Sequence, residues 1–407
     1  MTIWKRVLSL LLYAALILAL VPAMAPSARA DDDMYTITLV TEGQGTAELR
    51  KISTNEVVPN GSAFNNENLV VLRAYPADGW QFVSWQKVSG DEGYLIYPEY
   101  RSAQYRVRNG NAVIHAVFER ASYTVTAAAN PAAGGTAEVS LNNSTWSSSV
   151  TCYMGDTVYF RQTPADGYVF DAFSFTGNPT VNGSHFTMPA SNVTVTANYT
   201  AVPVSYIGAD GQPANAVGYH ILSSSDSTLS AGWYVVQDSV EMGNTRLTVN
   251  GAVNLILCDG AALNVPKGIT VEGNNSLTIY AQSAGTGALI ADDPDSENAG
   301  IGGLMGQSCG AVTICGGNIT AKGGSFGAAG IGGGAGGDGI NGGDGGTVTI
   351  TGGTVNATGG SARRGGAGIG GGAGDNSCKG GDGGTVTISG GTVTATAGNG
   401  DFGIGGG

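Results

Sequence analysis

From residue 34 onward, apolar and polar residues alternate with a period of two in short segments, and Gly, Asn and Asp separate these segments. Residues 113–118 and 193–199 are clear examples, with valine, isoleucine and alanine at every second position. Such alternation puts successive side chains on opposite faces of a β-strand, and the intervening residues are typical of turns. The pattern predicts an all-β chain.

The segments between residues 34 and 200 occur as two related copies. Tyr35-Thr-Ile-Thr recurs as Tyr123-Thr-Val-Thr, and Pro76-Ala-Asp-Gly recurs as Pro164-Ala-Asp-Gly. The second motif is a turn, because proline presets φ and glycine takes a positive φ. We expect the aromatic residues after it to form the core of each copy; an exposed platform for sugars is the alternative. These residues are Trp80, Phe82, Trp85, Tyr168, Phe170 and Phe173.

These motifs resemble the divergent internalin-type (InlB) B-repeat, with modules at residues 34–120 and 122–200. The resemblance implies a small β-grasp-like fold, used in bacterial surface proteins as a spacer or an adhesive unit, and it brings no catalytic residues. The first copy departs from the pattern between Asp91 and Arg108. This insertion, a contact loop or a longer hairpin, carries Tyr94, Tyr97 and Tyr100.

A different repeat follows, in which three short strands recur as a group with Gly-Gly corners between them. One column is isoleucine after glycine, at Ile269, Ile301, Ile331, Ile369 and Ile404. The second column consists of two apolar residues per turn, at Leu277/Ile279, Val312/Ile314, Val348/Ile350 and Val386/Ile388. The third column consists of Leu289/Ala291, Ile319/Ala321, Val355/Ala357 and Val393/Ala395. Leu247/Val249, Leu255/Leu257 and Leu263/Val265 fit the same scheme one turn earlier.

Three strands per turn predict a right-handed parallel β-helix over residues 244–407, with residues 203–243 covering its N-terminal end. A disordered glycine-rich tail would lack the strict Val-x-Ile alternation. The region resembles the Gly-Ile-Gly-Gly/Val-Thr-Ile repeats of exported Firmicutes proteins and, more loosely, β-helical carbohydrate-binding domains of clostridial secreted proteins. Because Gly407 lies inside a repeat and a stack needs a terminal cap, we expect the β-helix to be incomplete and to continue in a longer chain.

Residues 1–30 have the organisation of a signal peptide. Lys5 and Arg6 precede an apolar stretch over residues 7–21, and Ala28-Arg29-Ala30 forms a small-x-small cleavage site. The stretch is shorter than the roughly 20 residues of a membrane span, although an uncleaved signal anchor is the alternative. We therefore expect a secreted or cell-surface protein with no membrane span in the mature part. The formal net charge of −13 disfavours nucleic acid as a partner.

No constellation of catalytic residues is visible. The three histidines, His115, His185 and His220, lie outside the repeats of the predicted β-helix, whereas acid–base chemistry needs two titratable groups at one bond. The outward strand positions hold Thr313, Thr349, Thr387, Thr320, Asn356 and Thr394. Five cysteines without paired spacing predict neither disulfides nor zinc. We expect no enzyme activity, no catalytic or cofactor-binding residues and no cofactor.

Calcium is the one metal for which the sequence contains a binding motif. Residues 333–341 match the nonapeptide of repeats-in-toxin proteins, with Asp338 at the aspartate position, but the next nine residues have Thr347 there. Calcium needs six to eight oxygens, which such repeats draw from successive turns, so we predict no metal site. Another acidic loop, which we expect to be solvated, contains Asp292, Asp293, Asp295 and Glu297.

Two functional hypotheses follow. The first is a non-catalytic surface-display or adhesion stalk, whose partner is an extracellular polysaccharide or a ligand on a host or cell surface. The alternative is that the β-helix is the carbohydrate-binding module of a secreted protein that acts on polysaccharides.

Overall fold

The computed structural model describes residues 34–90, 92–361, 364–375, 377–399 and 402–407. The predicted signal peptide lies outside these residues. The chain forms two compact units, one ending at Tyr123 and the other spanning residues 124–407. In the described part, the strands are accompanied by a single 3-10 turn, η1 (Ala132–Gly134). This part contains no helix with the length and hydrophobicity of a membrane span. The predicted all-β class is confirmed.

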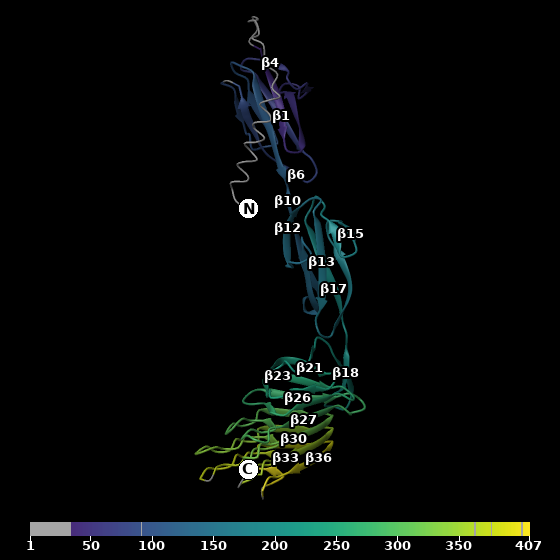
Figure 1. The fold of residues 1–407 in the computed structure, drawn as a ribbon, viewed down its shortest axis with the longest axis vertical. Coiled ribbons are helices and arrows are strands. Elements are labelled where there is room, and N and C mark those ends of the chain that lie inside the picture. Colours follow the sequence, from purple (N-terminus) through teal and green to yellow (C-terminus); the bar gives the residue numbers. More distant parts are fainter. Residues whose placement is uncertain (1–33, 91, 362–363, 376, 400–401) are drawn as a thin grey trace. The chain divides into compact units, whose positions relative to one another are not determined.

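The first module consists of two sheets that enclose a small core (Figure 1). One sheet has the order β4-β1-β9-β6, formed by β1 (Met34–Glu42), β4 (Ala63–Asn65), β6 (Trp80–Ser89) and β9 (Ala112–Arg120). The other has the order β3-β2-β5-β8-β7, formed by β2 (Gly45–Lys51), β3 (Val57–Val58), β5 (Leu69–Pro76), β7 (Tyr94–Ile96) and β8 (Ser102–Arg106). The module's first and last strands, β1 and β9, pair in parallel.

Alternation along these strands explains the core of the first module. Ile37, Leu72 and Ile114 come from both sheets and are fully buried, as the period of two requires. Trp85 is 2% exposed, and Trp80 and Phe82 pack against the same cluster. The prediction that the aromatic residues after the Pro-Ala-Asp-Gly turn form the core is therefore confirmed here.

The second module repeats this arrangement. One sheet has the order β12-β10-β17-β14, formed by β10 (Ser122–Asn130), β12 (Ser149–Tyr153), β14 (Tyr168–Phe175) and β17 (Val193–Ala201). The other has the order β11-β13-β16-β15, formed by β11 (Gly135–Ser140), β13 (Thr157–Pro164), β15 (Thr180–Asn182) and β16 (His185–Thr187). Again the outermost strands in sequence, β10 and β17, pair in parallel. Phe170 and Phe173 contact one another and other aromatic rings of the core, and Tyr168 lines a surface hollow.

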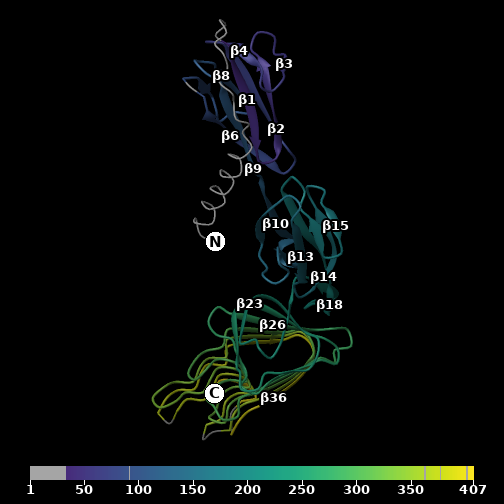
Figure 2. The same cartoon turned by 45° about the horizontal axis from the view of Figure 1, so that its top comes forward.

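Residues 220–405 form two parallel sheets coiled around a common axis (Figure 2). The larger consists of β20 (His220–Ile221), β21 (Thr228–Val236), β23 (Leu247–Leu257), β25 (Ile269–Thr270), β26 (Ser276–Ala281), β28 (Ile301–Gly302), β29 (Ala311–Ile314), β31 (Ile331–Gly332), β32 (Thr347–Ile350), β34 (Ile369–Gly370), β35 (Thr385–Ile388) and β37 (Ile404–Gly405). The smaller consists of β22 (Val240–Glu241), β24 (Ala262–Val265), β27 (Ala288–Asp292), β30 (Asn318–Lys322), β33 (Thr354–Thr358) and β36 (Thr392–Thr396).

The strand register places like residues over like, as the three columns predict. Ile331 pairs with Ile301 on one side and Ile369 on the other. Val348 and Ile350 lie between equivalent residues of β29 and β35, and the third column stacks in the same way through β27, β30, β33 and β36. The inward residues form one continuous apolar core, and each fully buried Ile or Leu contributes about 1.5–3 kcal/mol.

The start of the stack differs from the prediction in two respects. In the earliest predicted turn, Val253 and Leu255 pair with Leu277 and Ile279, so the second column begins two residues before the predicted Leu255/Leu257 pair. Residues 203–243, expected only to cover the end, contribute β20, β21 and β22 to the parallel sheets. A hairpin of β18 (Val204–Ile207) and β19 (Pro213–Ala216) packs against the outer side of β21 and β23.

Glycine is required where the turns approach each other most closely. At Gly332 and Gly370 φ is +145° and +142°, and an added Cβ would lie 1.9 Å from the carbonyl oxygen of the next turn. Only glycine combines such a φ with such an approach. Beyond these corners the chain runs out and back in glycine-rich segments, visible as long loops on one side of the coil (Figure 2). Their backbones hydrogen-bond from turn to turn, for example Gly372 N to Gly343 O at 3.0 Å.

We predict that Gly332→Ala lowers the free energy of unfolding by more than about 3 kcal/mol, because it adds an overlap with backbone to a strained φ that alone costs about 1–3 kcal/mol. Gly339→Ala is the matched control: its φ is +75°, but an added Cβ there meets nothing within 4 Å. Chemical denaturation followed by circular dichroism measures both variants. Equal losses in the two variants would contradict the close-approach argument.

Candidate functional site

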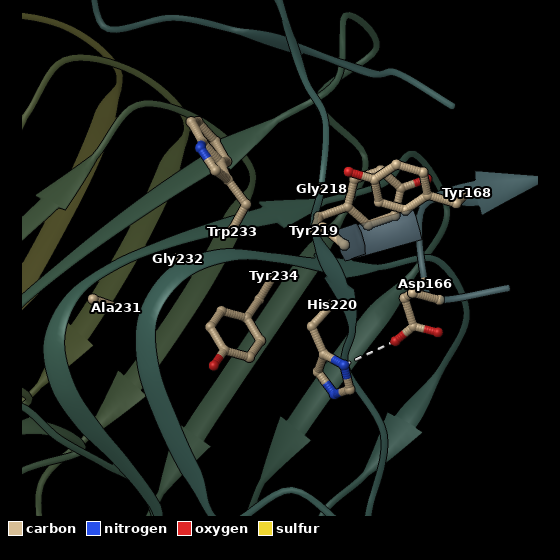
Figure 3. Close-up of a pocket in the computed structure, with 11 residues that line it drawn as sticks. Asp166, Tyr168, Gly218, Tyr219, His220, Ala231, Gly232, Trp233 and Tyr234 are labelled. Carbon is tan, nitrogen blue, oxygen red and sulfur yellow. Dashed lines mark ion pairs between the residues drawn. The ribbon is translucent and has the colours of Figure 1, made fainter. Parts of the chain in front are cut away.

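A hollow lies where the Pro-Ala-Asp-Gly turn of the second module meets the first strands of the parallel stack (Figure 3). Its volume is about 330 Å³. The lining residues are Ala133, Ala165, Asp166, Tyr168, Gly218, Tyr219, His220, Ala231, Gly232, Trp233 and Tyr234. Most of the lining residues are aromatic residues, alanine or glycine, and none of them is a serine, threonine or cysteine that could act as a nucleophile.

His220 is the centre of the polar contacts in this hollow. Its Nδ1 lies 2.8 Å from Asp166 Oδ2 (Figure 3), and its Nε2 lies 3.1 Å from Asp226. Carboxylates only accept hydrogen bonds, so the imidazolium form alone donates to both partners. Asp166 also accepts a hydrogen bond from the Ile221 backbone N–H at 3.0 Å. The carboxylates therefore hold the ring in place.

Asp226 is itself fixed by its neighbours. Burial pushes its pKa upward, but hydrogen bonds from Ser223 and His220 outweigh this effect and hold the pKa below its ordinary value. The carboxylate therefore stays charged beside the imidazole. Because both carboxylates and the imidazole are engaged with each other, the arrangement fastens two segments of chain.

The apolar part of the hollow is also engaged in packing. Tyr219 is 5% exposed and lies against Gly167, where an added Cβ would be 3.1 Å from its ring. Burial raises the pKa of its hydroxyl, with smaller contributions from Cys258 and Asp166. Trp233 stacks on Tyr280 and contacts Tyr206 of the outer hairpin. We interpret the hollow as the seam by which the second module is attached to the stack.

A buried charged cluster lies near the first corner of the stack. Arg246 donates hydrogen bonds to the carbonyl oxygens of Lys267, Ile269 and Ala299, and its guanidinium lies 3.5 Å from Asp293. Burial lowers the pKa of Arg246 to about 10. Lys267 lies 3.4 Å from Asp293, and the Asp293 side chain also accepts a hydrogen bond from Asn298 at 3.0 Å.

The prediction that the acidic loop is merely solvated is therefore wrong for Asp293, which is 3% exposed. Its neighbour Asp292 has a pKa raised by burial, although Lys322 opposes the shift. The two basic partners of Asp293 lie on earlier turns, and this is why the loop sequence alone did not reveal the ion pairs.

The remaining residues singled out in the sequence are dispersed. Thr313, Thr349 and Thr387 form one outward row, and Thr320, Asn356 and Thr394 form another. Asp338 is exposed. Among the residues that the structure describes, no three His, Cys, Asp or Glu side chains are grouped closely enough to hold a metal. The five cysteines are unpaired, and burial raises the pKa of Cys309 to about 12. His115 and His185 are not among the residues that line the hollow.

The tyrosine-bearing insertion of the first module forms the hairpin of β7 and β8 together with the segment that joins them. Tyr94, Tyr97 and Tyr100 are 44%, 63% and 60% exposed. Both sequence interpretations, a longer hairpin and a contact loop, are therefore compatible with its position on the surface.

We predict that Arg246→Met lowers the free energy of unfolding by about 3–5 kcal/mol, because it leaves the buried Asp293 carboxylate without its guanidinium. Lys322→Met is the control, since Lys322 is exposed and pairs loosely with Asp292 at 3.9 Å, and it costs less than about 1 kcal/mol. Thermal and urea unfolding distinguish the two. If Arg246→Met lowered the free energy of unfolding no more than Lys322→Met does, the charged cluster would not be stabilising.

We also predict that His220→Ala speeds proteolysis at residues 201–203 several-fold, because the contact of His220 with Asp166 across the seam is lost, together with its contact to Asp226 on the stack side. Each such exposed pair contributes about 0–1 kcal/mol. His185→Ala is the control, since His185 lies on β16 of the second module and does not line the hollow. Limited proteolysis with a non-specific protease, followed by mass spectrometry, gives the rates. Unchanged cleavage in His220→Ala would contradict the fastening role.

Comparison with known proteins identifies the two modules. A family model described as "Divergent InlB B-repeat domain" matches residues 35–122 and 123–203. The curated proteins give no match. One similar solved structure is the C-terminal fragment of pilus adhesin SpaC from Lactobacillus rhamnosus GG, at 10% identity over 42% of this chain and 98% of that chain, with a TM-score of 0.22. Another is the major pilin protein (T-13) from Streptococcus pyogenes serotype GAS131465, at 11% identity over 41% of this chain and 97% of that chain, with a TM-score of 0.15. These TM-scores are too low to carry an argument, so the comparison rests on the family model, to which residues 35–203 are similar in two consecutive copies.

Proposed function

We propose that this protein is a non-catalytic, extracellular bacterial stalk that displays binding surfaces. Divergent InlB B-repeats indicate an extracellular surface protein. The observation that carries the proposal is the parallel stack, whose core continues from rung to rung. Each rung is held by backbone hydrogen bonds to the rungs on either side and by apolar contacts within, as in other repeat proteins. Such a stack suits a rigid support.

The non-catalytic part of the proposal is supported by how the titratable groups are used. His220 is engaged by Asp166 and Asp226, and Arg246 and Lys267 are engaged by Asp293. These groups fasten segments of chain. The outward rows of the stack hold threonine and asparagine at the positions that register aligns, for example Thr349 between Thr313 and Thr387.

Surface display is tested on intact cells of the producing bacterium. Antibodies against the parallel stack are expected to label unpermeabilised cells, and protease added outside the cells is expected to remove the label. A cytoplasmic protein of comparable abundance serves as the control and should be neither labelled nor cleaved. Antigen found only in lysed cells, or only free in the medium, would contradict display.

A further inference from the structure

The most exposed aromatic side chains of the first module lie together on one hairpin. We define the tyrosine loop as residues 97–101, which join β7 to β8. Tyr97 and Tyr100 are 63% and 60% exposed, and their ring centroids lie 6.2 Å apart at 80°. Tyr94, on the adjoining strand, is 44% exposed and lies beneath the Arg108 guanidinium at 5.6 Å. Large aromatic surface is normally buried, so this cluster requires an explanation.

The backbone of the loop is held firmly from below. Trp85, which is 2% exposed, donates its backbone N–H to Pro98 O at 2.8 Å and its indole N–H to Tyr100 O at 3.1 Å. The carbonyl oxygen of Arg101 accepts a hydrogen bond from Ala74 N at 2.9 Å, and that of Tyr97 accepts one from Tyr100 N at 3.2 Å. A loop fixed in this way loses little conformational entropy when it binds a ligand.

Comparison of the two modules shows that the loop retains a strained residue. In the second module the equivalent hairpin joins β15 to β16, and its first loop residue is Gly183, with φ +61°. In the first module the residue at that place is Tyr97, also with φ +61°. Glycine adopts this conformation without cost, whereas a bulky residue is strained in it. Strained residues persist chiefly at functional sites, which indicates that the Tyr97 ring has a use.

The size and chemistry of the loop favour a sugar ligand. A stable protein interface buries about 800 Å² on each partner and takes about 20–30 residues, far more than one hairpin tip presents. A pyranose ring is small, and its C–H face packs on a single aromatic face. Glu99 and Arg101 are exposed on either side of Tyr100 and supply an acceptor and donors for sugar hydroxyls. The net charge of −13 disfavours an anionic polymer.

We propose that the tyrosine loop binds the sugar units of a neutral extracellular polysaccharide. This binding site lies in the first B-repeat module, not on the parallel stack. It adds a ligand to the display role, and either proposal can fail while the other holds, because labelling of intact cells does not depend on Tyr97 or Tyr100.

The test measures retention of the chain from residue 31 onwards on immobilised xylan, mannan, β-1,3-glucan and amylose, with polygalacturonate as the anionic comparison. We expect saturable retention on at least one neutral polysaccharide. Tyr97→Ala combined with Tyr100→Ala should weaken it at least tenfold. Tyr153→Ala, which removes a 39% exposed tyrosine of the second module, should leave it unchanged.

A second variant separates loss of the ring from loss of the fold. Tyr97→Gly removes the side chain and relieves the positive φ, so we expect a higher thermal midpoint together with weaker retention. Retention unchanged in Tyr97→Gly or in the double variant would overturn the proposal. Retention on polygalacturonate alone would overturn it as well. Retention on none of the five polysaccharides would also overturn it, and would indicate that the tyrosine loop binds a protein partner.

Discussion

The stacking of like side chains on successive turns is the interaction on which the C-terminal half depends. Parallel strands in register put each residue next to its counterpart in the neighbouring turn. Ile301, Ile331 and Ile369 therefore form a continuous apolar column. A slip of one residue would turn every such side chain outward, so the register is specified at every rung. The repetition in the sequence is a direct consequence of this requirement.

Glycine supplies the second constraint, since the corners between strands bring backbones closer than any side chain permits. At Gly332 an added Cβ would overlap the backbone of the following turn. The glycine-rich segments beyond the corners hydrogen-bond to one another between turns, so the high glycine content is part of the ordered structure. Length is free to vary in these segments because they lie outside the coil.

The features that the sequence predicted best are those with a period. The apolar columns, the two related modules and the aromatic core around Trp85 could all be recognised from spacing. Features that depend on one contact between distant segments could not be recognised in this way. Asp293 pairs with Arg246, and Asp166 pairs with His220, but no local sequence pattern indicates either contact. The same holds for Tyr168, which lines the hollow together with residues of the stack that are distant in the sequence. The sequence predicts the tyrosine loop as an insertion, but the positive φ of Tyr97 depends on the fold of the hairpin and has no sequence signature.

The proposed support role requires an ordered parallel stack, and hydrogen–deuterium exchange measures that order most directly. Residues of β32 and β33 lie in the interior of the stack, with rungs paired on both sides. Their amide hydrogens should exchange slowly, over hours at neutral pH, and only through cooperative opening. Exchange within seconds across Thr347–Ile350 and Thr354–Thr358, as in an unstructured glycine-rich chain, would contradict the account.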